Sequence, residues 1–268
     1  MIEKSDFFKL KKEIEIATDE AFKFARMKEK NKNDYILFLS QSRYNPKIDK
    51  NRFSPWTIDN KKIEIFDRHR VEFLLQYLNL QYNFQNKNSI DSNSTINMEL
   101  MIYSHIWESR HNLSKLKRLA DLCDSNNYDW NIKIPEDSKY KYIRKSIREV
   151  FKKHNLKIYD VINECYKSQL RNAFSHSLYN FGLNMNSIFL ENFDGNNNKI
   201  EKLSFDEWTM IFLKSALLQN IFHNKFTKEI ENLEEGVKYK VKMDYNDESK
   251  TGIITYDHNT KRFDGKFL

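Results

Sequence analysis

The sequence contains very few residues that interrupt regular backbone structure. Five glycines and three prolines are spread over 268 residues. Proline lacks the amide hydrogen that an inner helical turn needs, and glycine lowers helix stability, so their scarcity favours long helices. It also argues against a glycine-rich phosphate-binding loop. We therefore expect a mainly α-helical protein.

Apolar residues recur at helical spacing through most of the chain. Residues 6–29 predict an amphipathic helix docked on a core, and residues 30–61, which contain two of the three prolines, lose this period. The pattern returns in four further stretches, 62–85, 94–123, 138–154 and 158–178. Ser204 and Glu207 form a capping box, which predicts that a last helix begins there and runs to about residue 233.

Two parts of the sequence carry strand patterns instead. Residues 179–183, 187–193 and 199–203 predict a short β excursion, and three more strands are expected after Gly236. The predicted fold class is mainly α, a helical bundle with this excursion and a small C-terminal β appendage. We expect three parts: residues 1–61 packed on the core, a helical domain at 62–235, and the β appendage at 236–268.

The charge of the chain favours an anionic partner. Lysine and arginine outnumber the acids 45 to 38, and the pI is about 9.1. The stretch at 138–154 concentrates this charge, and its candidate contacts to an RNA backbone are Lys141, Arg144, Lys145 and Arg148. A solvated lysine face is the ordinary alternative for such a run.

Cysteines and apolar runs indicate the compartment. Cys123 and Cys165 both lie in apolar helical patterns, which predicts buried thiols in a reducing environment. The first residues have no apolar signal region, and no run approaches 18 apolar residues. We expect a cytoplasmic protein that does not contact a membrane.

Metal and cofactor chemistry has little support in the sequence. His105 and His111 are six residues apart and do not share a helix face, and the two cysteines are far apart. The His-Glu-x-x-His motif and the nucleophile elbow are both absent. We expect no metal and no cofactor.

The stretch from Leu170 to Ser177 combines a fixed positive charge with a titratable imidazole. On a helix, five polar side chains would fall within an arc of about 140°, and these are Arg171, Asn172, Ser175, His176 and Tyr179. Arginine binds phosphate through a planar fork, and histidine moves protons near neutrality. The pair therefore suits phosphodiester chemistry, with Asn172 spaced to hold the ring of His176.

The spacing of this pair is not diagnostic by itself. An Arg and a His separated by four to six residues should occur roughly once by chance in this composition, and the pattern occurs twice. The second match joins Arg148 to His154 in a lysine-rich segment, and we interpret it as accidental. For Arg171 and His176 the alternative is that both have structural roles. The arginine would then lie at a helix end, and the hydrogen bonds of the histidine would be made within the fold.

The residues of the first match, which read Arg-Asn-Ala-x-x-His, resemble the motif of the HEPN family. This family is named for nucleotide-binding proteins of higher eukaryotes and prokaryotes. The resemblance covers Leu170 to Ser177 and the helical layout of about residues 62–232. It implies a HEPN-like helical bundle and a metal-independent endoribonuclease. In such enzymes the 2′-hydroxyl of the RNA attacks the adjacent phosphorus and leaves a 2′,3′-cyclic phosphate.

The same resemblance implies roles for the residues of the motif. His176 would act as general acid and base, Arg171 would stabilise the phosphoryl transition state, and Asn172 would orient His176 or bind phosphate. HEPN enzymes commonly place a further polar or acidic residue near the pair from another helix, and Glu108 is our candidate by position. Ser175 and Tyr179 are further candidates for support.

The resemblance also implies partners. One Arg/His pair supplies half of an acid/base couple, and HEPN sites are commonly formed at a dimer interface, so we expect a homodimer acting on single-stranded or tRNA-like RNA. A toxin or antiviral defence setting, with an antitoxin or defence-system partner, follows by family. The alternative is a non-catalytic HEPN-like module that binds nucleotides or RNA or regulates a partner. In its favour, Tyr179 stands three residues after His176, whereas one toxin branch has a tyrosine two residues after. A helical scaffold with an accidental motif is the third reading.

Overall fold

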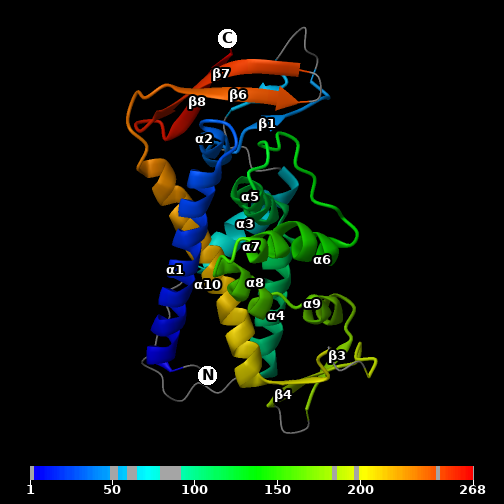
Figure 1. Ribbon diagram of the computed structural model, residues 1–268. Coiled ribbons are helices and arrows are strands. Elements are labelled where there is room, and N and C mark those ends of the chain that lie inside the picture. The colour runs from blue at the N-terminus through cyan, green and yellow to red at the C-terminus, as the bar shows by residue number, and fades with distance from the viewer. Residues whose placement is uncertain are drawn as a thin grey trace.

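The computed structural model describes residues 3–48, 54–58, 65–78, 92–182, 186–195, 199–245 and 248–267. The fold is mainly helical with small antiparallel sheets, as the sequence predicts (Figure 1). The helices are α1 (Lys4–Lys28), α2 (Asp34–Leu39), α3 (Ile65–Leu78), α4 (Asn93–Glu108), α5 (Arg110–Cys123), α6 (Lys139–Tyr142), the π-helix η1 (Ile143–Arg148), α7 (Glu149–Lys153), α8 (Ile158–Cys165), α9 (Ser168–Ser175) and α10 (Phe205–Glu231). The strands are β1 (Arg43–Tyr44), β2 (Trp56–Thr57), β3 (Tyr179–Phe181), β4 (Ser187–Leu190), β5 (Lys202–Ser204), β6 (Tyr239–Tyr245), β7 (Glu248–Asp257) and β8 (Arg262–Phe267).

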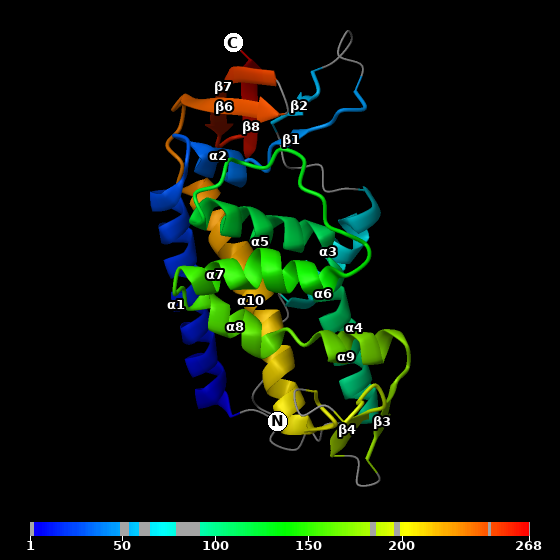
Figure 2. The ribbon, with the colours of Figure 1, turned by 45° about the vertical axis from the view of Figure 1, so that its right-hand side comes forward.

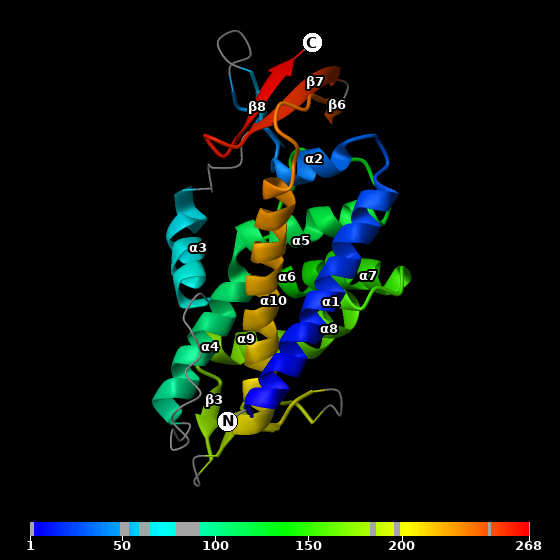
Figure 3. The same ribbon diagram turned by 90° about the vertical axis from the view of Figure 1, so that its left-hand side faces the viewer.

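Two long helices, α1 and α10, lie side by side along the molecule (Figure 3). The predicted capping box is confirmed at the start of α10, where the Glu207 amide donates to Ser204 Oγ at 3.2 Å and the Ser204 amide donates to Glu207 Oε2 at 2.8 Å. Such a reciprocal pair satisfies two amide groups that the first turn leaves open. Local sequence therefore fixes where this helix begins.

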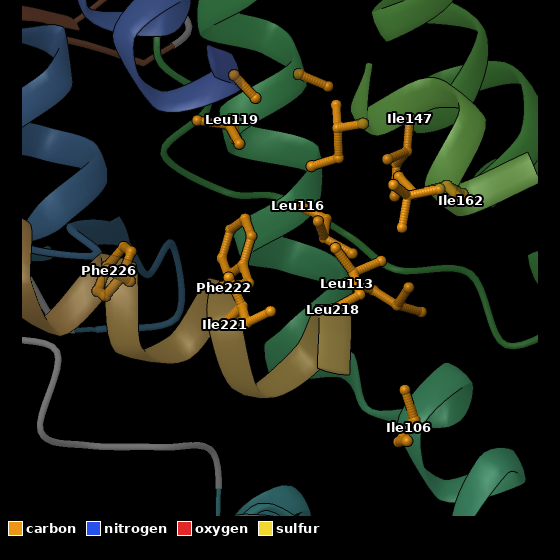
Figure 4. Close-up of a cluster of buried hydrophobic side chains, with 14 of the residues drawn as sticks. Ile106, Leu113, Leu116, Leu119, Ile147, Ile162, Leu218, Ile221, Phe222 and Phe226 are labelled. Atoms are coloured by element: carbon orange, nitrogen blue, oxygen red, sulfur yellow. The ribbon is translucent and has the colours of Figure 1, made fainter. Parts of the chain in front are cut away.

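The apolar core lies between these helices and the shorter ones that cross them. Figure 4 shows side chains of α5 and α10 packed against each other, with Ile147 of η1 and Ile162 of α8 close by. The aromatic residues add directional contacts, for example Phe22 of α1 against Phe222 of α10 with ring centroids 5.1 Å apart. Because α1 shares this core, the N-terminal helix is packed on the bundle as predicted.

The helix predicted at 138–154 is continuous but includes a wide turn, η1. Its buried residues Ile143, Ile147 and Phe151 are spaced by four. In a regular α-helix each step of four residues drifts by about 40° around the axis. The wider i→i+5 turn removes part of that drift. The π-turn therefore keeps these three side chains facing the core.

The prediction of a single helix over 94–123 is wrong, because the helix is interrupted at Ser109. This residue is fully buried and has an extended backbone (ψ 111°). Its amide donates to the His105 carbonyl at 3.1 Å, and its Oγ accepts from the Asn112 amide at 3.3 Å. One serine thus ends α4 and begins α5, which is the position where serine competes best with continued helix.

The single helix predicted over 158–178 is also wrong. Tyr166 and Lys167 are extended, with ψ of 107° and 101°, and they separate α8 from α9. The buried hydroxyl of Tyr103 on α4 accepts from the Lys167 amide at 2.8 Å and donates to the Cys165 carbonyl at 3.1 Å. A side chain from a distant helix therefore satisfies the backbone groups that the break exposes.

The predicted β excursion and β appendage both form antiparallel sheets, in the orders β3-β4-β5 and β6-β7-β8. Gly236, with φ of 72°, lies between α10 and β6, as its flexibility suggests. The C-terminal sheet packs on the early chain (Figure 1). Tyr245 stacks on Tyr44 with ring centroids 4.1 Å apart, and the Asn33 side chain donates to the Lys240 carbonyl at 2.9 Å.

Two sequence expectations concern the whole chain. Cys123 and Cys165 are both free and buried, which agrees with the predicted buried thiols. Over the described ranges, each helix is too short or too polar to cross a membrane.

A half-buried histidine on α10 predicts acid sensitivity. Burial, aided by the nearby Lys115 ammonium, lowers the pKa of His223 from 6.5 to about 4. The fold therefore favours the neutral ring, and the stability that this group contributes is lost as the pH falls from about 6.5 to about 4. We expect a loss of up to about 3 kcal/mol in the free energy of unfolding, measured by urea denaturation across this range.

The control for this prediction is His223→Gln, which removes the titrating group and should flatten that part of the profile. Asp34 acts in the opposite direction, since burial raises its pKa to about 6 and stability rises as it becomes protonated. The difference between wild type and His223→Gln isolates the histidine. Parallel pH profiles of the two proteins would contradict the prediction.

Candidate functional site

The side chain of Arg171 on α9 is held by α4. Its Nη1 donates to Glu108 Oε1 at 2.6 Å, and its Nη2 donates to Asn172 Oδ1 at 2.9 Å. The Arg171 side chain is 14% exposed. Glu108, the candidate that the HEPN resemblance suggested by position, thus contacts Arg171. These bonds use two of the five N–H groups of the guanidinium.

Glu108 binds a second cation that sequence reasoning missed. Lys139, the first residue of α6, donates from Nζ to the other carboxylate oxygen of Glu108. Arg70 of α3 donates to the Glu108 backbone carbonyl at 3.1 Å. Glu108 is the last residue of α4, and the negative end of a helix dipole favours cations. The C-terminal end of α4 therefore gathers basic groups from α3, α6 and α9, which lie around it in Figure 2.

An apolar floor lies beside this ion network. Tyr166 packs on Trp107 with ring centroids 4.8 Å apart. Burial raises the pKa of Tyr166 to about 12, with the Arg171 charge opposing and the Glu108 charge adding to the shift. Tyr166 is therefore neutral at physiological pH. Its hydroxyl lies close enough to Arg171 and Glu108 for both charges to act on it, so aromatic surface lies near the ion pair.

His176 lies immediately after α9 and not within it. Its amide donates to the Asn172 carbonyl at 3.1 Å, and Ser177 then takes a left-handed conformation with φ of 54°. The His176 ring is exposed, and it makes no hydrogen bond within the described part of the chain. The Asn172 oxygen contacts Arg171, so the amide that was predicted to hold the ring serves the guanidinium. The helix ends before the i,i+4 pairing of these side chains is established.

Ser175 and Tyr179 occupy different surroundings. Ser175 is exposed at the last residue of α9. The Tyr179 hydroxyl donates to Asn97 Oδ1 of α4 at 2.6 Å. Asn97 precedes Glu108 by eleven residues, which is roughly 16 Å along the helix. Tyr179 therefore anchors β3 to α4 and does not join the Arg171–Glu108 pair.

The basic helix begins at the site and continues across the surface. Lys141, Arg144 and Lys145 are exposed. Arg148 is occupied by the fold, because it donates to Glu149 Oε1 at 2.6 Å and to Asn163 Oδ1 at 2.9 Å. Three of the four candidate RNA contacts are therefore accessible to solvent, and the fourth has a structural role.

The histidine of the second Arg/His match, His154, also has structural partners. His154 Nε2 lies 2.9 Å from Asp124 Oδ1, and its ring packs 5.3 Å from the Phe24 ring. With Arg148 bound to Glu149 and Asn163, both members of this pair are engaged by their own neighbours. The motif at Arg171 differs because its histidine ring is left exposed.

Apolar side chains are exposed near the motif. Leu178 is 36% exposed two residues after His176, and Met101 and Met98 of α4 are 39% and 55% exposed. Met101 falls on the α4 face that carries Asn97 and Glu108, since the three lie within about 40° of one another around the helix. This face therefore presents apolar surface beside the charged groups.

The arrangement combines a guanidinium with N–H groups left over for an anion and an exposed imidazole a few residues away. Among the described residues, no three His, Cys, Asp or Glu side chains are grouped so that they could hold a metal ion. Comparison with known proteins adds no assignment, because no protein-family model, no curated protein and no solved structure matches the chain.

Proposed function

We propose that this chain is a metal-independent endoribonuclease of the HEPN type. The observation that supports it is the organisation of the motif: Glu108 and Asn172 orient Arg171, while the His176 ring at the end of the same helix stays exposed to solvent. An oriented cation and an accessible proton carrier in one short motif are the two kinds of group that such phosphodiester cleavage uses. By family, the proposed setting is a cytoplasmic toxin or antiviral defence effector.

The chemistry assigned to these residues is an internal transfer. The imidazole of His176 accepts the proton of the RNA 2′-hydroxyl as O2′ forms a bond to the adjacent phosphorus. The P–O5′ bond breaks, and O5′ leaves as a hydroxyl after taking a proton. Arg171 stabilises the charge on the phosphoryl oxygens. DNA lacks the attacking hydroxyl, so the mechanism demands RNA.

A homodimer completes the acid/base couple in this proposal. One imidazole accepts the first proton, and the second copy's His176 supplies the proton to the leaving O5′. The exposed Met101 and Leu178 support an interface on this side of the molecule, because apolar surface beside a polar site is typical of protein contacts.

The experiment that tests the activity is incubation of the purified protein with total RNA and tRNA in EDTA, followed by end-group analysis. We expect fragments with 2′,3′-cyclic phosphate and 5′-hydroxyl ends, and no cleavage of an oligonucleotide that carries a 2′-deoxy sugar at the cleaved position. A requirement for added divalent cations, 3′-hydroxyl ends or cleavage of DNA would contradict the proposal. RNA binding without any cleavage would support the alternative, a non-catalytic HEPN-like binding module.

A further inference from the structure

A cavity of about 580 Å³ lies beside α5, which begins two residues after Glu108. Three segments form its walls: α5, the end of β1 with the residues that follow it, and residues 130–134. Ligand sites in proteins typically have volumes of about 300–1,000 Å³. The cavity is therefore large enough for a small molecule of nucleotide size, and the motif at Arg171 does not contribute to it.

The walls of this cavity are strongly basic. Arg43, Arg110, Arg118 and Lys133 all line it, and none of its described lining residues is a carboxylate. Glu136, which is outside the lining, binds Arg110 at 2.5 Å but is itself 79% exposed. Four cations therefore line one cavity, and the acid that contacts Arg110 is solvated. This arrangement favours an anion with more than one negative charge.

Arg118 gives the strongest indication of an anion site among the four cations, because it is 2% exposed and its hydrogen-bond partners are neutral. Nη1 donates to Gln41 Oε1 at 3.1 Å, and Nη2 donates to the Ser42 carbonyl at 3.3 Å. Its Nε has no hydrogen-bond partner among the described residues. Burying a charge without an opposite charge is costly. Arg118 is therefore a buried guanidinium with neutral hydrogen-bond partners at a wall of the cavity. An anion bound in the cavity would supply the opposite charge.

Two further basic groups, Lys115 and His111, lie close to Arg118. Lys115 on α5 is 7% exposed, with its ammonium 4.3 Å from the Phe226 ring centroid. Burial, and then the Arg118 charge, lowers the pKa of Lys115 to about 8. Burial, and then the charges of Lys115 and the arginines, holds the pKa of the cavity residue His111 well below its usual value. These basic groups therefore lie close enough together for each positive charge to disfavour protonation of its neighbours.

We propose that the α5 cavity binds a small molecule that carries a diphosphate or triphosphate group. Arginine forks match phosphate oxygens, and Ser114 and Asn131 add neutral hydrogen-bonding groups to the same walls. A long RNA strand fits less well, because α5, β1 and residues 130–134 enclose the space from three sides. The group has two sources, a free polyphosphate and a nucleotide, and they share this chemistry.

The test is isothermal titration calorimetry of the full-length protein with pyrophosphate, tripolyphosphate and ADP at moderate ionic strength. Lys133→Gln and Arg110→Gln remove exposed or half-exposed lining cations and should leave the fold intact. Each is expected to weaken binding about tenfold or more, since a lost charge-assisted bond has that effect. Lys12→Gln, an exposed lysine on α1, is the matched control and should bind as the wild type does.

The outcomes distinguish a free polyphosphate from a nucleotide, and they also test small-molecule binding against RNA binding. Equal affinity for tripolyphosphate and ADP supports recognition of the phosphates alone, and tighter binding of ADP supports a nucleotide. The proposal is overturned if none of the three ligands binds at millimolar concentration, or if Lys133→Gln and Arg110→Gln bind as the control does. It is also overturned if only a single-stranded RNA binds with this dependence. Because the experiment measures ligand binding, a negative result would overturn this proposal without bearing on the proposed RNA cleavage.

Discussion

Replacing His176 with alanine is expected to reduce the rate of RNA cleavage by about 10²–10⁴-fold, the usual contribution of a general acid or base. RNA binding should persist, because Arg171 keeps its bonds to Glu108 and Asn172. The His176 ring is exposed, so the free energy of unfolding should change by less than about 0.5 kcal/mol. The measurements are initial cleavage rates in EDTA, fluorescence anisotropy with a labelled RNA, and urea denaturation.

His69→Ala is the matched control for this variant. Its side chain is 94% exposed on α3 and takes no part in the motif, so its cleavage rate should equal that of the wild type. Equal cleavage by wild type and His176→Ala would show that another residue, or a contaminating nuclease, does the chemistry. Loss of RNA binding along with cleavage would assign His176 to binding instead.

Replacing Glu108 with alanine should cause the largest loss of stability among the site variants. Arg171 and Lys139, with side chains 14% and 11% exposed, would then face each other without a carboxylate. Breaking a buried ion pair costs about 3–5 kcal/mol, and the 28% exposure of the Glu108 side chain points to the lower end, about 3 kcal/mol. Urea denaturation measures this, and scanning calorimetry should show a melting temperature about 6–12 °C lower.

Glu136→Ala tests whether burial is the cause of that loss. Glu136 also binds an arginine, Arg110, at 2.5 Å, but it is 79% exposed, so its removal should cost less than about 1 kcal/mol. Adding Lys139→Met to Glu108→Ala removes one of the two unpaired cations and should recover part of the loss. Equal costs for Glu108→Ala and Glu136→Ala would refute the buried network.

Much of the fold follows from signals that are local in the sequence. The capping box at Ser204 and Glu207 fixes the start of α10, and alternation after Gly236 gives the C-terminal strands. The breaks at Ser109 and at Tyr166 to Lys167 were not predictable in this way. The second depends on Tyr103, whose hydroxyl reaches a backbone carbonyl 62 residues away. Helical periodicity continues through both breaks, so pattern alone joins helices that tertiary contacts separate.

The candidate site was predictable to a similar extent. The residue types at Arg171 and His176 indicated phosphodiester chemistry, and the family pattern directed attention to Glu108, which contacts Arg171. Lys139 carried no such signal, because it is one of many lysines on a basic helix and its contact with Glu108 spans 31 residues. The end of α9 before His176 was equally hidden, since it depends on the left-handed turn at Ser177.

The wide turn of η1 makes chain length, and not only residue identity, a determinant of the site. The turn accommodates backbone that a regular α-helix would not, and Lys139 lies on its N-terminal side. Deleting one residue of the regular helix between Lys139 and η1 would rotate Lys139 by about 100° around the axis, and Lys139 would then leave Glu108. Deleting one residue inside η1 would instead convert the wide turn to α-helix and keep Lys139 close to its present direction, because the wide turn absorbs that residue. The η1 segment is therefore the part of this helix in which chain length can change while the charge around the motif is preserved.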